Sequence, residues 1–346
     1  MHSVQGKRVF VGLSGGVDSG VTAALLKHSG AQVTGVFIKG WYPPGMPCTW
    51  AEDRRDAMRV AAHLGLQFQT FDASAEYKSA VIDYLLAEYR AGRTPNPDIM
   101  CNREVKFGAF HRFAKAEGAD YIATGHYARI HYSVQGSSLL RGEDESKDQS
   151  YFLWAVPKDA LDDTLFPLGG LRKEEVRKMA AKFALPNARK KDSQGICFLG
   201  NISVEDFLRA EFDPEAGKAF DSGGQEVGTH GGAVLYTLGE RVALTDASPG
   251  PWYVVAKDLG TNTIVVSKER GSGGTNDAIR LTSTNWFGVT PEGEVEAQYR
   301  YHGPRITGTL AGSVFTPRTA MPEPIAQGQS LVLYRGEECL GGGIIE

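Results

Sequence analysis

Residues 9–26, VFVGLSGGVDSGVTAALL, constrain the fold of this chain more than any other stretch. A β-branched apolar run leads into a glycine-rich turn. Apolar residues at helical spacing follow, with Val17, Val21, Ala24 and Leu25 on one face. The pattern predicts a strand, a tight turn and a helix. Glycines permit close backbone approach and the first N–H groups of a helix attract anions, so the turn is expected to bind phosphate.

Two common phosphate-binding motifs do not fit this turn. A Walker loop carries a lysine directly after its last glycine, and the stretch from Gly12 to Ser19 has none. The glycines also lack the G-x-G-x-x-G spacing of dinucleotide-binding turns. The hydroxyls of Ser14 and Ser19 remain as donors beside the backbone N–H groups. Because no lysine would hold a transferred γ-phosphate, the turn suits a pyrophosphate that leaves; an ordinary glycine turn is the alternative interpretation.

The rest of the first 125 residues alternates strand and helix patterns. The β-rich runs RVFVGL, QVTGVFIK, FQTFD and DYIATG are separated by long stretches with apolar residues at helical spacing. This alternation predicts an α/β domain whose parallel sheet is covered on both faces. A hairpin with the polar tip GEDESKDQS is expected over residues 127–155, and a helix over about 171–184.

The pattern changes after residue 200. One helix is expected near residues 203–212, followed by the β runs AVLYTL, WYVVAKD and TIVVS, and the chain is nearly all β from about residue 275. We therefore predict three parts: an α/β domain over residues 1–200, a small mixed domain over 201–270 and a C-terminal β-barrel over 271–346.

Composition narrows the class of protein. No apolar run is long enough to span a bilayer, and the start MHSVQGKRVF carries no apolar leader, so a cytoplasmic protein without a membrane partner is expected. Nothing marks an oligomer interface, and a monomer is expected. The net charge of −4 means that any nucleic-acid binding needs a local basic face. The segment between Leu171 and Asp192 is expected to supply one, with eight lysines and arginines against Glu174, Glu175 and Asp192, a balance of +5; a solvated helix face is the alternative.

Four cysteines, Cys48, Cys101, Cys197 and Cys339, form no C-x-x-C pair, which disfavours a disulfide framework or a zinc finger. Cys48 and Cys339 are interpreted as inert, packed thiols. The other two lie in sequence contexts that point to chemistry.

The stretch GRTPNPDIMCNREVKF places Cys101 near the start of a predicted helix, which Asn102 or Asp98 would cap. A helix N-terminus together with Arg103 and Lys106 favours the thiolate form of the cysteine. If a helical turn forms, Asp98 shares a face with Cys101 as an acid–base group. A buried cysteine beside a capping aspartate is the alternative.

Cys197 lies in the glycine-flanked segment KKDSQGICFLG, behind three cations, Arg189, Lys190 and Lys191. A cysteine in a loop among cations is more reactive than one in a core, and a loop could carry it between a sulfur donor and an active site. A buried side chain within ICFL is the alternative.

Taken together, SGGVDS, NPDIMCN and GICFLG resemble the bacterial tRNA-specific 2-thiouridylase family, within the PP-loop N-type ATP pyrophosphatases. The likeness continues through GVFIKGW, KFGAF, ADYIATGHYAR, KDQSYFL and HGGAVLYTLGER, over essentially the whole chain. It implies ATP-dependent 2-thiolation of the wobble uridine in tRNAs for Lys, Glu and Gln. The uridine O2 would be adenylated and replaced by persulfide sulfur, with release of pyrophosphate and AMP. A cysteine desulfurase or sulfur-relay protein would supply the sulfur.

The resemblance also implies roles for individual residues. Cys101 would be the nucleophile, Cys197 the persulfide carrier and Asp98 the general acid/base. The ATP-binding residues would be Gly12, Leu13, Ser14, Gly15, Gly16, Val17, Asp18, Ser19, Ile38 and Gly125. Asp18 is also the carboxylate that would help place Mg²⁺ beside ATP. The target base and the tRNA would contact Asn96, Pro97, Asp98, His126, Lys147, Asp148, Gln149, Arg300, Tyr301 and Gln329.

The implied chemistry joins Cys101 and Cys197 in a disulfide that a reductant must open at each turnover, so the two cysteines must meet. Two departures from the family stand out: Ile38 replaces a frequent Met, and the proline-rich residues 42–50 replace an acidic stretch, which leaves the role of that loop open.

Three alternatives stay open. Another PP-loop ligase acting on a small molecule would not need paired cysteines. A non-catalytic, ATP-dependent RNA-binding protein would not turn ATP over to AMP. Finally, an iron–sulfur enzyme would use Asp98, Cys101 and Cys197 as cluster ligands, an option ranked below the persulfide relay because three cysteines are the commoner minimum.

Overall fold

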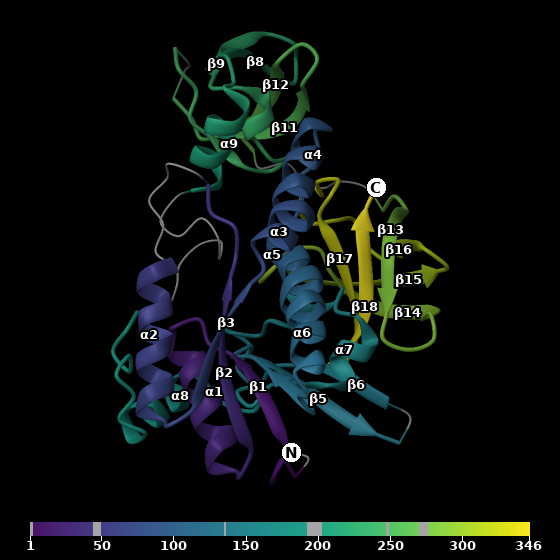
Figure 1. Ribbon diagram of the computed structural model, residues 1–346. Helices are drawn as coiled ribbons and strands as arrows, with labels where there is room; N and C mark the ends of the chain where they lie inside the picture. The colour runs from purple at the N-terminus through teal and green to yellow at the C-terminus, as the bar shows by residue number, and fades with distance from the viewer. Residues whose placement is uncertain (1–2, 44–49, 135, 192–202, 247–248, 270–275) are drawn as a thin grey trace.

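The computed structural model describes residues 3–43, 50–134, 136–191, 203–246, 249–269 and 276–346. Figure 1 shows three parts. A sheet with flanking helices holds the N-terminus, a small β-rich part lies beyond the end of the central helices, and a barrel packs against the side of those helices. Among the described residues, no helix combines the length and the apolar character needed to cross a membrane.

The first part contains a parallel sheet with strand order β3-β2-β1-β4-β7. Its strands are β1 (Arg8–Gly12), β2 (Gln32–Lys39), β3 (Gln67–Asp72), β4 (Tyr121–Ala123) and β7 (Thr164–Leu165). The four runs expected as strands are thus confirmed. Strand order reverses between β1 and β4, and in open α/β sheets ligands bind at this switch point, beyond the carboxyl ends of the strands.

Alternate side chains of β1 explain why both faces of this sheet are covered. Val9 and Val11 pack into a cluster with α1 (Val17–His28) and α2 (Trp50–His63), whereas Phe10 faces the opposite cluster with α6 (Phe110–Ala116). The helix α8 (Lys173–Lys182) packs on α1.

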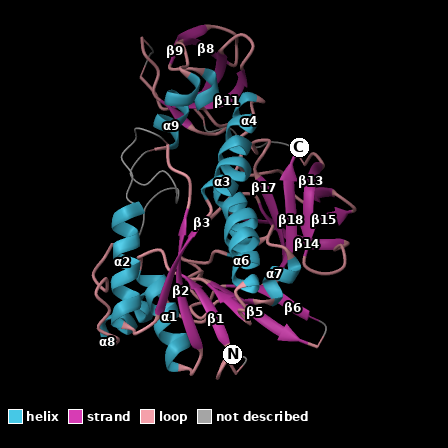
Figure 2. Ribbon diagram, in the orientation of Figure 1, coloured by secondary structure: helices cyan, strands magenta, loops and turns pink. Residues whose placement is uncertain are grey.

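Two long central helices run beside the sheet and contain π-helical segments (Figure 2). The first joins α3 (Ser74–Tyr77), η1 (Lys78–Asp83) and α4 (Tyr84–Arg90). The second joins α5 (Pro97–Met100), η2 (Cys101–Ala109) and α6. Both η1 and η2 have π winding, in which hydrogen bonds join residues five apart. Helices were expected over both stretches, but their apolar spacing did not indicate this winding.

The middle part is a sheet of order β10-β11-β12-β8-β9 with one helix, α9 (Val204–Phe212). Its strands are β8 (Gly217–Asp221), β9 (Glu226–His230), β10 (Arg241–Val242), β11 (Trp252–Asp258) and β12 (Thr263–Ser267). The expected strand AVLYTL is wrong, because it begins with the 3₁₀ turn η4 (Ala233–Leu235). Gly232, at φ 120°, enters that turn, and the Asn262 side chain accepts a hydrogen bond from the Ala233 N–H at 2.9 Å.

The last part is a barrel closed by pairing of its first and last strands, β13 with β18. Its strands are β13 (Ile279–Trp286), β14 (Gly293–Gln298), β15 (Arg305–Ala311), β16 (Val314–Pro317), β17 (Ser330–Arg335) and β18 (Glu338–Ile345). A hairpin of the first part, β5 (Ala128–Ser133) and β6 (Gly136–Arg141), extends the barrel sheet by pairing with β18.

The expected tip of this hairpin is wrong. The last residue pair of the hairpin is Ser133 with Gly136, and Gly136 has a φ of +115°. The stretch GEDESKDQS follows the hairpin as a loop. Carboxylates order this loop: the Asp144 side chain accepts from the Ser146 N–H and from the Lys173 N–H. The short helices η3 (Ser150–Leu153) and α7 (Lys158–Asp162) then lead back to the sheet.

Candidate active site

A cavity of about 330 Å³ opens at the carboxyl ends of β1, β2 and β4. Ten residues singled out from the sequence line it: Gly12, Leu13, Ser14, Asp18, Ser19, Ile38, Cys101, Gly125, His126 and Gln149. Six further residues complete the lining: Gly40, Tyr42, Tyr77, Val105, Lys106 and Thr124. The glycine turn and the cysteine helix, far apart in the sequence, therefore meet at the switch point of the sheet.

The glycine turn has the geometry of a phosphate cradle. Gly15 has φ +79°, and a Cβ there would lie 2.4 Å from the Asp53 carbonyl oxygen, so only glycine fits. Gly16 caps α1 without any side-chain hydrogen bond to the first turn. Such a helix start leaves N–H groups for an anion, and the residues present fit the phosphates of ATP.

Gly125 fits closely against this turn. A Cβ at Gly125 would lie 2.9 Å from the Ser19 nitrogen and 3.1 Å from the Asp18 Cβ. The backbone that follows β4 thus approaches the first turn of α1 as closely as a glycine allows.

Asp18 is held by neighbouring side chains. Lys173 Nζ lies 2.8 Å from both carboxylate oxygens, and the Tyr127 hydroxyl donates to Oδ1 at 2.9 Å. Among the residues that the structure describes, no group of three or more His, Cys, Asp or Glu side chains is arranged for a metal ion. Asp18 is therefore engaged in an ion pair with Lys173.

The cysteine helix begins at an asparagine. Asn96 Oδ1 accepts from the N–H groups of Asp98 (3.1 Å) and Ile99 (3.3 Å), and Pro97 occupies the first helical position. The expected caps, Asn102 and Asp98, are wrong, because Asn102 is buried and donates to the Phe152 carbonyl.

Asp98 is half-buried in the first turn of this helix. Burial raises the pKa of its carboxyl group above the usual value, and the charge of Lys106 acts in the opposite direction. A carboxyl group with a raised pKa, one helical turn before a cysteine, is suited to proton transfer.

The π winding of η2 determines which cation accompanies Cys101. Cys101, Val105 and Lys106 all line the cavity. In an α-helix, at 100° per residue, Lys106 would lie about 140° around the axis from Cys101. The π winding brings residues five apart to the same side. Arg103, the other nearby cation, instead pairs with Glu104 at 3.0 Å on the exposed side.

His126 is buried in the cavity wall. Its Nδ1 lies 2.7 Å from the Thr124 hydroxyl, and its ring lies 5.7 Å from that of Phe107 and 5.8 Å from that of Phe166. Burial, aided by the charge of Lys106, holds the pKa of His126 well below its usual value. The imidazole is therefore neutral at neutral pH and can hydrogen-bond to a substrate but not attract phosphate.

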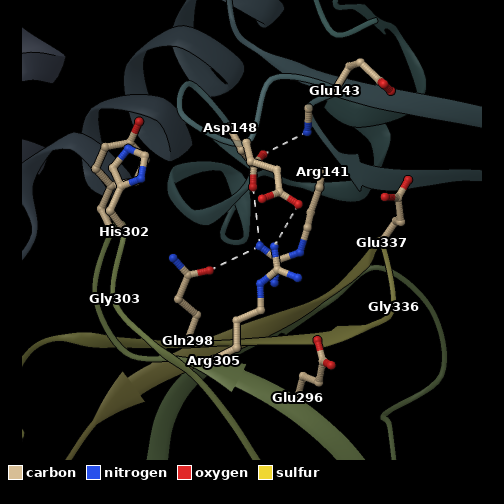
Figure 3. A pocket seen from close by; sticks show the side chains of 13 residues that line it. Arg141, Glu143, Asp148, Glu296, Gln298, His302, Gly303, Arg305, Gly336 and Glu337 are labelled. Atoms are coloured by element: carbon tan, nitrogen blue, oxygen red, sulfur yellow. Dashed lines mark hydrogen bonds and ion pairs between the residues drawn. The ribbon is translucent and has the colours of Figure 1, made fainter.

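Asp148 is saturated by donors of the protein itself (Figure 3). Its carboxylate accepts from the Gly142 N–H (2.9 Å), the Ser150 N–H and hydroxyl (both 3.0 Å), and Arg141 Nη1 (3.4 Å). These bonds fix the loop that carries the next residue, Gln149. Asp148 thus orders the chain beside the cavity rather than presenting a free carboxylate.

Gln149 is positioned from both directions. Its side-chain oxygen accepts from the Tyr127 N–H at 3.0 Å, and its own N–H donates to the Tyr127 carbonyl at 2.9 Å. Lys147, also expected at the tRNA, is half-buried in the same loop. Gln149 is therefore the member of this segment that reaches the cavity.

The remaining residues expected at the tRNA lie on the barrel side, in two places. Tyr301 and Asp148 line a hollow of about 510 Å³. Arg300 and Gln329 line another of about 300 Å³. There Arg300 pairs with Glu323 at 2.6 Å, and Gln329 Nε2 donates to the Thr94 carbonyl at 2.7 Å. The structure thus distributes six of the expected tRNA residues over three hollows, and Asn96, Pro97, Asp98 and Lys147 line none of these three.

Part of the basic segment 172–191 serves internal contacts. Besides Lys173, Arg177 donates to the carbonyls of residues 188 and 190, and Lys190 pairs with Asp53 and Asp56. The cations left at the surface are Arg172, Lys178, Lys182, Arg189 and Lys191. Cys197 lies outside the described residues, as does most of the proline-rich loop, so a meeting of Cys101 and Cys197 stays a prediction.

Several site residues were not assigned to the site from the sequence. Thr124 was signalled only by its position before Gly125. Lys106 was noted as a neighbour of Cys101, but helical spacing did not direct it to the cavity. No local pattern marked Lys173 or Asn187, whose contacts with the glycine turn arise from the tertiary fold.

Comparisons with known proteins agree with this layout. Three family models match successive stretches of the chain. One described as a tRNA methyl transferase HUP domain covers residues 7–201, a tRNA methyl transferase PRC-barrel domain covers 205–268, and an aminomethyltransferase beta-barrel domain covers 276–345.

Among solved structures, the U34-tRNA thiolase NcsA from Methanococcus maripaludis is 16% identical over 61% of this chain and 69% of its own, with a TM-score of 0.38. A 4-thiouridine synthetase solved with RNA and ATP is 20% identical over 60% and 50%, with a TM-score of 0.36.

A curated relative is far more similar. The tRNA-specific 2-thiouridylase MnmA of Lactococcus lactis subsp. cremoris (strain SK11) is 43% identical over 98% of this chain and 94% of its own length. The chain therefore belongs to the tRNA-specific 2-thiouridylase family.

Proposed function

We propose that this protein replaces the C2 oxygen of the wobble uridine in tRNAs for Lys, Glu and Gln with sulfur, using ATP. As a member of its family it is a tRNA sulfurtransferase. The observation that carries the finer proposal is the shared cavity: Ser14, Asp18 and Ser19 of the glycine turn line the same 330 Å³ space as Cys101. Activation by ATP and attack by a thiol can therefore occur at one base.

In the first step, the uridine O2 attacks the α-phosphate of ATP, and pyrophosphate leaves. The turn from Gly12 to Ser19 would hold the phosphates, while Ile38 and Gly125 would contact the adenosine. Mg²⁺ is expected to arrive with ATP. Asp18 would help to place it only by exchanging its ion pair with Lys173.

In the second step, the terminal sulfur of a Cys197 persulfide attacks C2, and AMP leaves. The Cys101 thiolate then attacks the inner sulfur, which releases thiouridine and leaves a Cys101–Cys197 disulfide. A two-electron reductant restores both thiols. Asp98 would move the proton, and the neutral His126 and Gln149 would hold the extruded base.

The proposal includes its setting. Residues 1–200 would carry the chemistry, and residues 201–270 and 271–346 would hold the tRNA. The enzyme would act as a cytoplasmic monomer that receives sulfur from a cysteine desulfurase or a sulfur-relay protein. The contacts of Asn96, Pro97, Lys147, Arg300 and Tyr301 with tRNA belong to the proposal.

The test is a thiolation assay with ATP, Mg²⁺, a cysteine desulfurase and a tRNA-Glu transcript, read by mass spectrometry of nucleosides. The description of one matching family model names a tRNA methyl transferase. Mass spectrometry distinguishes the two reactions, because replacing oxygen by sulfur and adding a methyl group change the nucleoside mass by different amounts. We expect 2-thiouridine from the wild type and from Cys339→Ser, and none from Cys101→Ser or Cys197→Ser. Cys339 is a matched control, because burial raises the pKa of its thiol to about 12.

Other outcomes select the alternatives. Thiouridine formed by Cys197→Ser from free sulfide would restrict Cys197 to carrying sulfur. Activity that appears only after anaerobic iron–sulfur reconstitution would favour a cluster at Asp98, Cys101 and Cys197. AMP formation without tRNA that tolerates loss of both cysteines would favour a ligase acting on a small molecule, and the absence of AMP formation would favour a binding protein.

A further inference from the structure

Residues 187–190 fasten the glycine turn to its surroundings. Lys190 pairs with Asp53 (2.9 Å) and Asp56 (2.7 Å) on α2, and Arg177 of α8 donates to the carbonyls of residues 188 (3.2 Å) and 190 (2.6 Å). This short segment therefore touches α2, α8 and the turn. It also precedes the stretch that carries Cys197.

Asn187 makes the contact with the turn itself. Its side chain is 7% exposed, and Nδ2 donates to the carbonyls of Gly15 (2.9 Å) and Gly16 (3.0 Å). One buried amide thus holds two successive peptide groups of the turn.

The direction of these bonds matters. In a trans peptide the C=O and the following N–H point to opposite sides of the chain. Holding the carbonyls of Gly15 and Gly16 therefore turns the N–H groups of Gly16 and Val17 away from Asn187. Glycine-rich turns have many accessible backbone conformations, and without an anchor the arrangement that binds an anion would be only one of them.

We propose that Asn187 is a positioning residue for the phosphate site, which keeps the N–H group of Val17 directed at the phosphates of ATP, while the N–H group of Gly16 donates to Ser14 Oγ at 3.3 Å. The proposal rests on the proposed use of ATP by this turn. Asn187 acts through the backbone of the turn. Removing the Asn187 side chain lowers the fraction of molecules whose turn has the conformation that binds phosphate, and the apparent affinity for ATP falls in proportion to that fraction.

The test is isothermal titration of the Mg²⁺ complex of α,β-methylene-ATP, which cannot release pyrophosphate, into the full-length protein saturated with tRNA transcript, with the affinity for tRNA measured in parallel. Asn187→Asp keeps the shape and removes the donor, and Asn187→Ala removes the side chain. Arg177→Met is the matched control, because it also removes two hydrogen bonds to backbone carbonyls of the segment without touching the turn. Circular dichroism checks that each variant folds.

We expect ATP affinity to fall by about tenfold or more in both Asn187 variants, with tRNA affinity and Arg177→Met within about threefold of the wild type. Asn187→Ala decides the matter if the buried charge of Asn187→Asp prevents folding. Unchanged ATP affinity in a folded Asn187→Ala would overturn the inference, and so would an equal loss in Arg177→Met. If the wild type binds no ATP, the proposed function fails first.

Discussion

Replacing Asp148 by asparagine tests whether this residue orders the protein or contacts RNA. The Arg141–Asp148 pair is almost enclosed, with side-chain exposures of 8% and 11%. Among the described residues, Arg141 otherwise bonds to Gln298 Oε1 at 3.2 Å and lies 3.5 Å from the centre of the Tyr334 ring, while its Nε and Nη2 lack hydrogen-bond partners. Asp148→Asn would leave the guanidinium charge buried beside no carboxylate.

The expected loss follows from this burial. Removing one partner of a buried ion pair destabilises a protein by about 3–5 kcal/mol. The asparagine oxygen can still accept from the N–H groups of Gly142 and Ser150, so we take the lower end, about 3 kcal/mol. At about 1.4 kcal/mol per factor of ten, local opening becomes roughly 100-fold more frequent.

A matched control breaks an exposed pair instead. Lys218 and Glu226 lie 2.8 Å apart with side-chain exposures of 61% and 46%. Glu226→Gln should therefore change stability by only about 0–1 kcal/mol.

Hydrogen exchange of peptides from β6 and β14, followed by mass spectrometry without RNA, reads the difference. We expect roughly 100-fold faster exchange in Asp148→Asn and no comparable change in the control. If Asp148→Asn exchanges like the wild type but binds tRNA less tightly, the reasoning is wrong and Asp148 acts at the RNA.

Three further predictions follow from charges near the sites. Asp98→Asn should abolish thiolation without lowering the melting temperature at neutral pH. Burial raises the pKa of Asp98 above its value in the unfolded chain, so the folded wild type binds this proton more tightly. The wild type therefore loses stability as pH rises through the pKa of the folded state, and the variant, which has no carboxyl group there, does not. Burial lowers the pKa of Lys257 from 10.5 to about 8, so the unfolded chain binds more protons between those values. Stability of the middle sheet should therefore gain from this group as pH rises through that window, and acylation of its amine should be half-maximal near pH 8. In Lys106→Met, the pH of half-maximal alkylation of Cys101 should rise by about one unit, and Arg103→Met should leave it unchanged.

The elements predicted correctly are those whose signal is local. Strands β1, β2 and β3 are continuous β-branched or alternating runs between turns, and the helices show apolar faces. The strand expected at AVLYTL failed because the Asn262 side chain, from a later strand connection, fixes the Ala233 N–H in a turn. The hairpin tip failed for a similar reason: GEDESKDQS looks like a turn, but contacts with Lys173 and Arg141 make it an ordered loop.

The candidate site divides along the same line. Motif strings gave the glycine turn, Gly125 and Cys101, because backbone geometry at a phosphate and a thiol near a helix start require particular residues at fixed spacing. The partner of Gln329, and the bond that links Arg141 beside Asp148 to Gln298, depend on how the barrel docks, and no local pattern encodes that docking. Six of the residues that resemble tRNA contacts in sequence therefore divide, in the structure, among three hollows.

The π winding of η2 shows how a single small residue can decide the geometry of the cavity. An ideal Cβ on Gly108 would lie 2.8 Å from the carbonyl oxygen of Arg103, five residues earlier, so the winding that brings Lys106 to the cavity lined by Cys101 requires glycine there. Gly108→Ala should push the helix toward α winding and carry Lys106 away from Cys101. Alkylation of Cys101 in this variant should then depend on pH as it does in Lys106→Met, although no charge has been removed. A wild-type profile in a folded Gly108→Ala would show that the lysine reaches the cysteine by some route other than the helix winding.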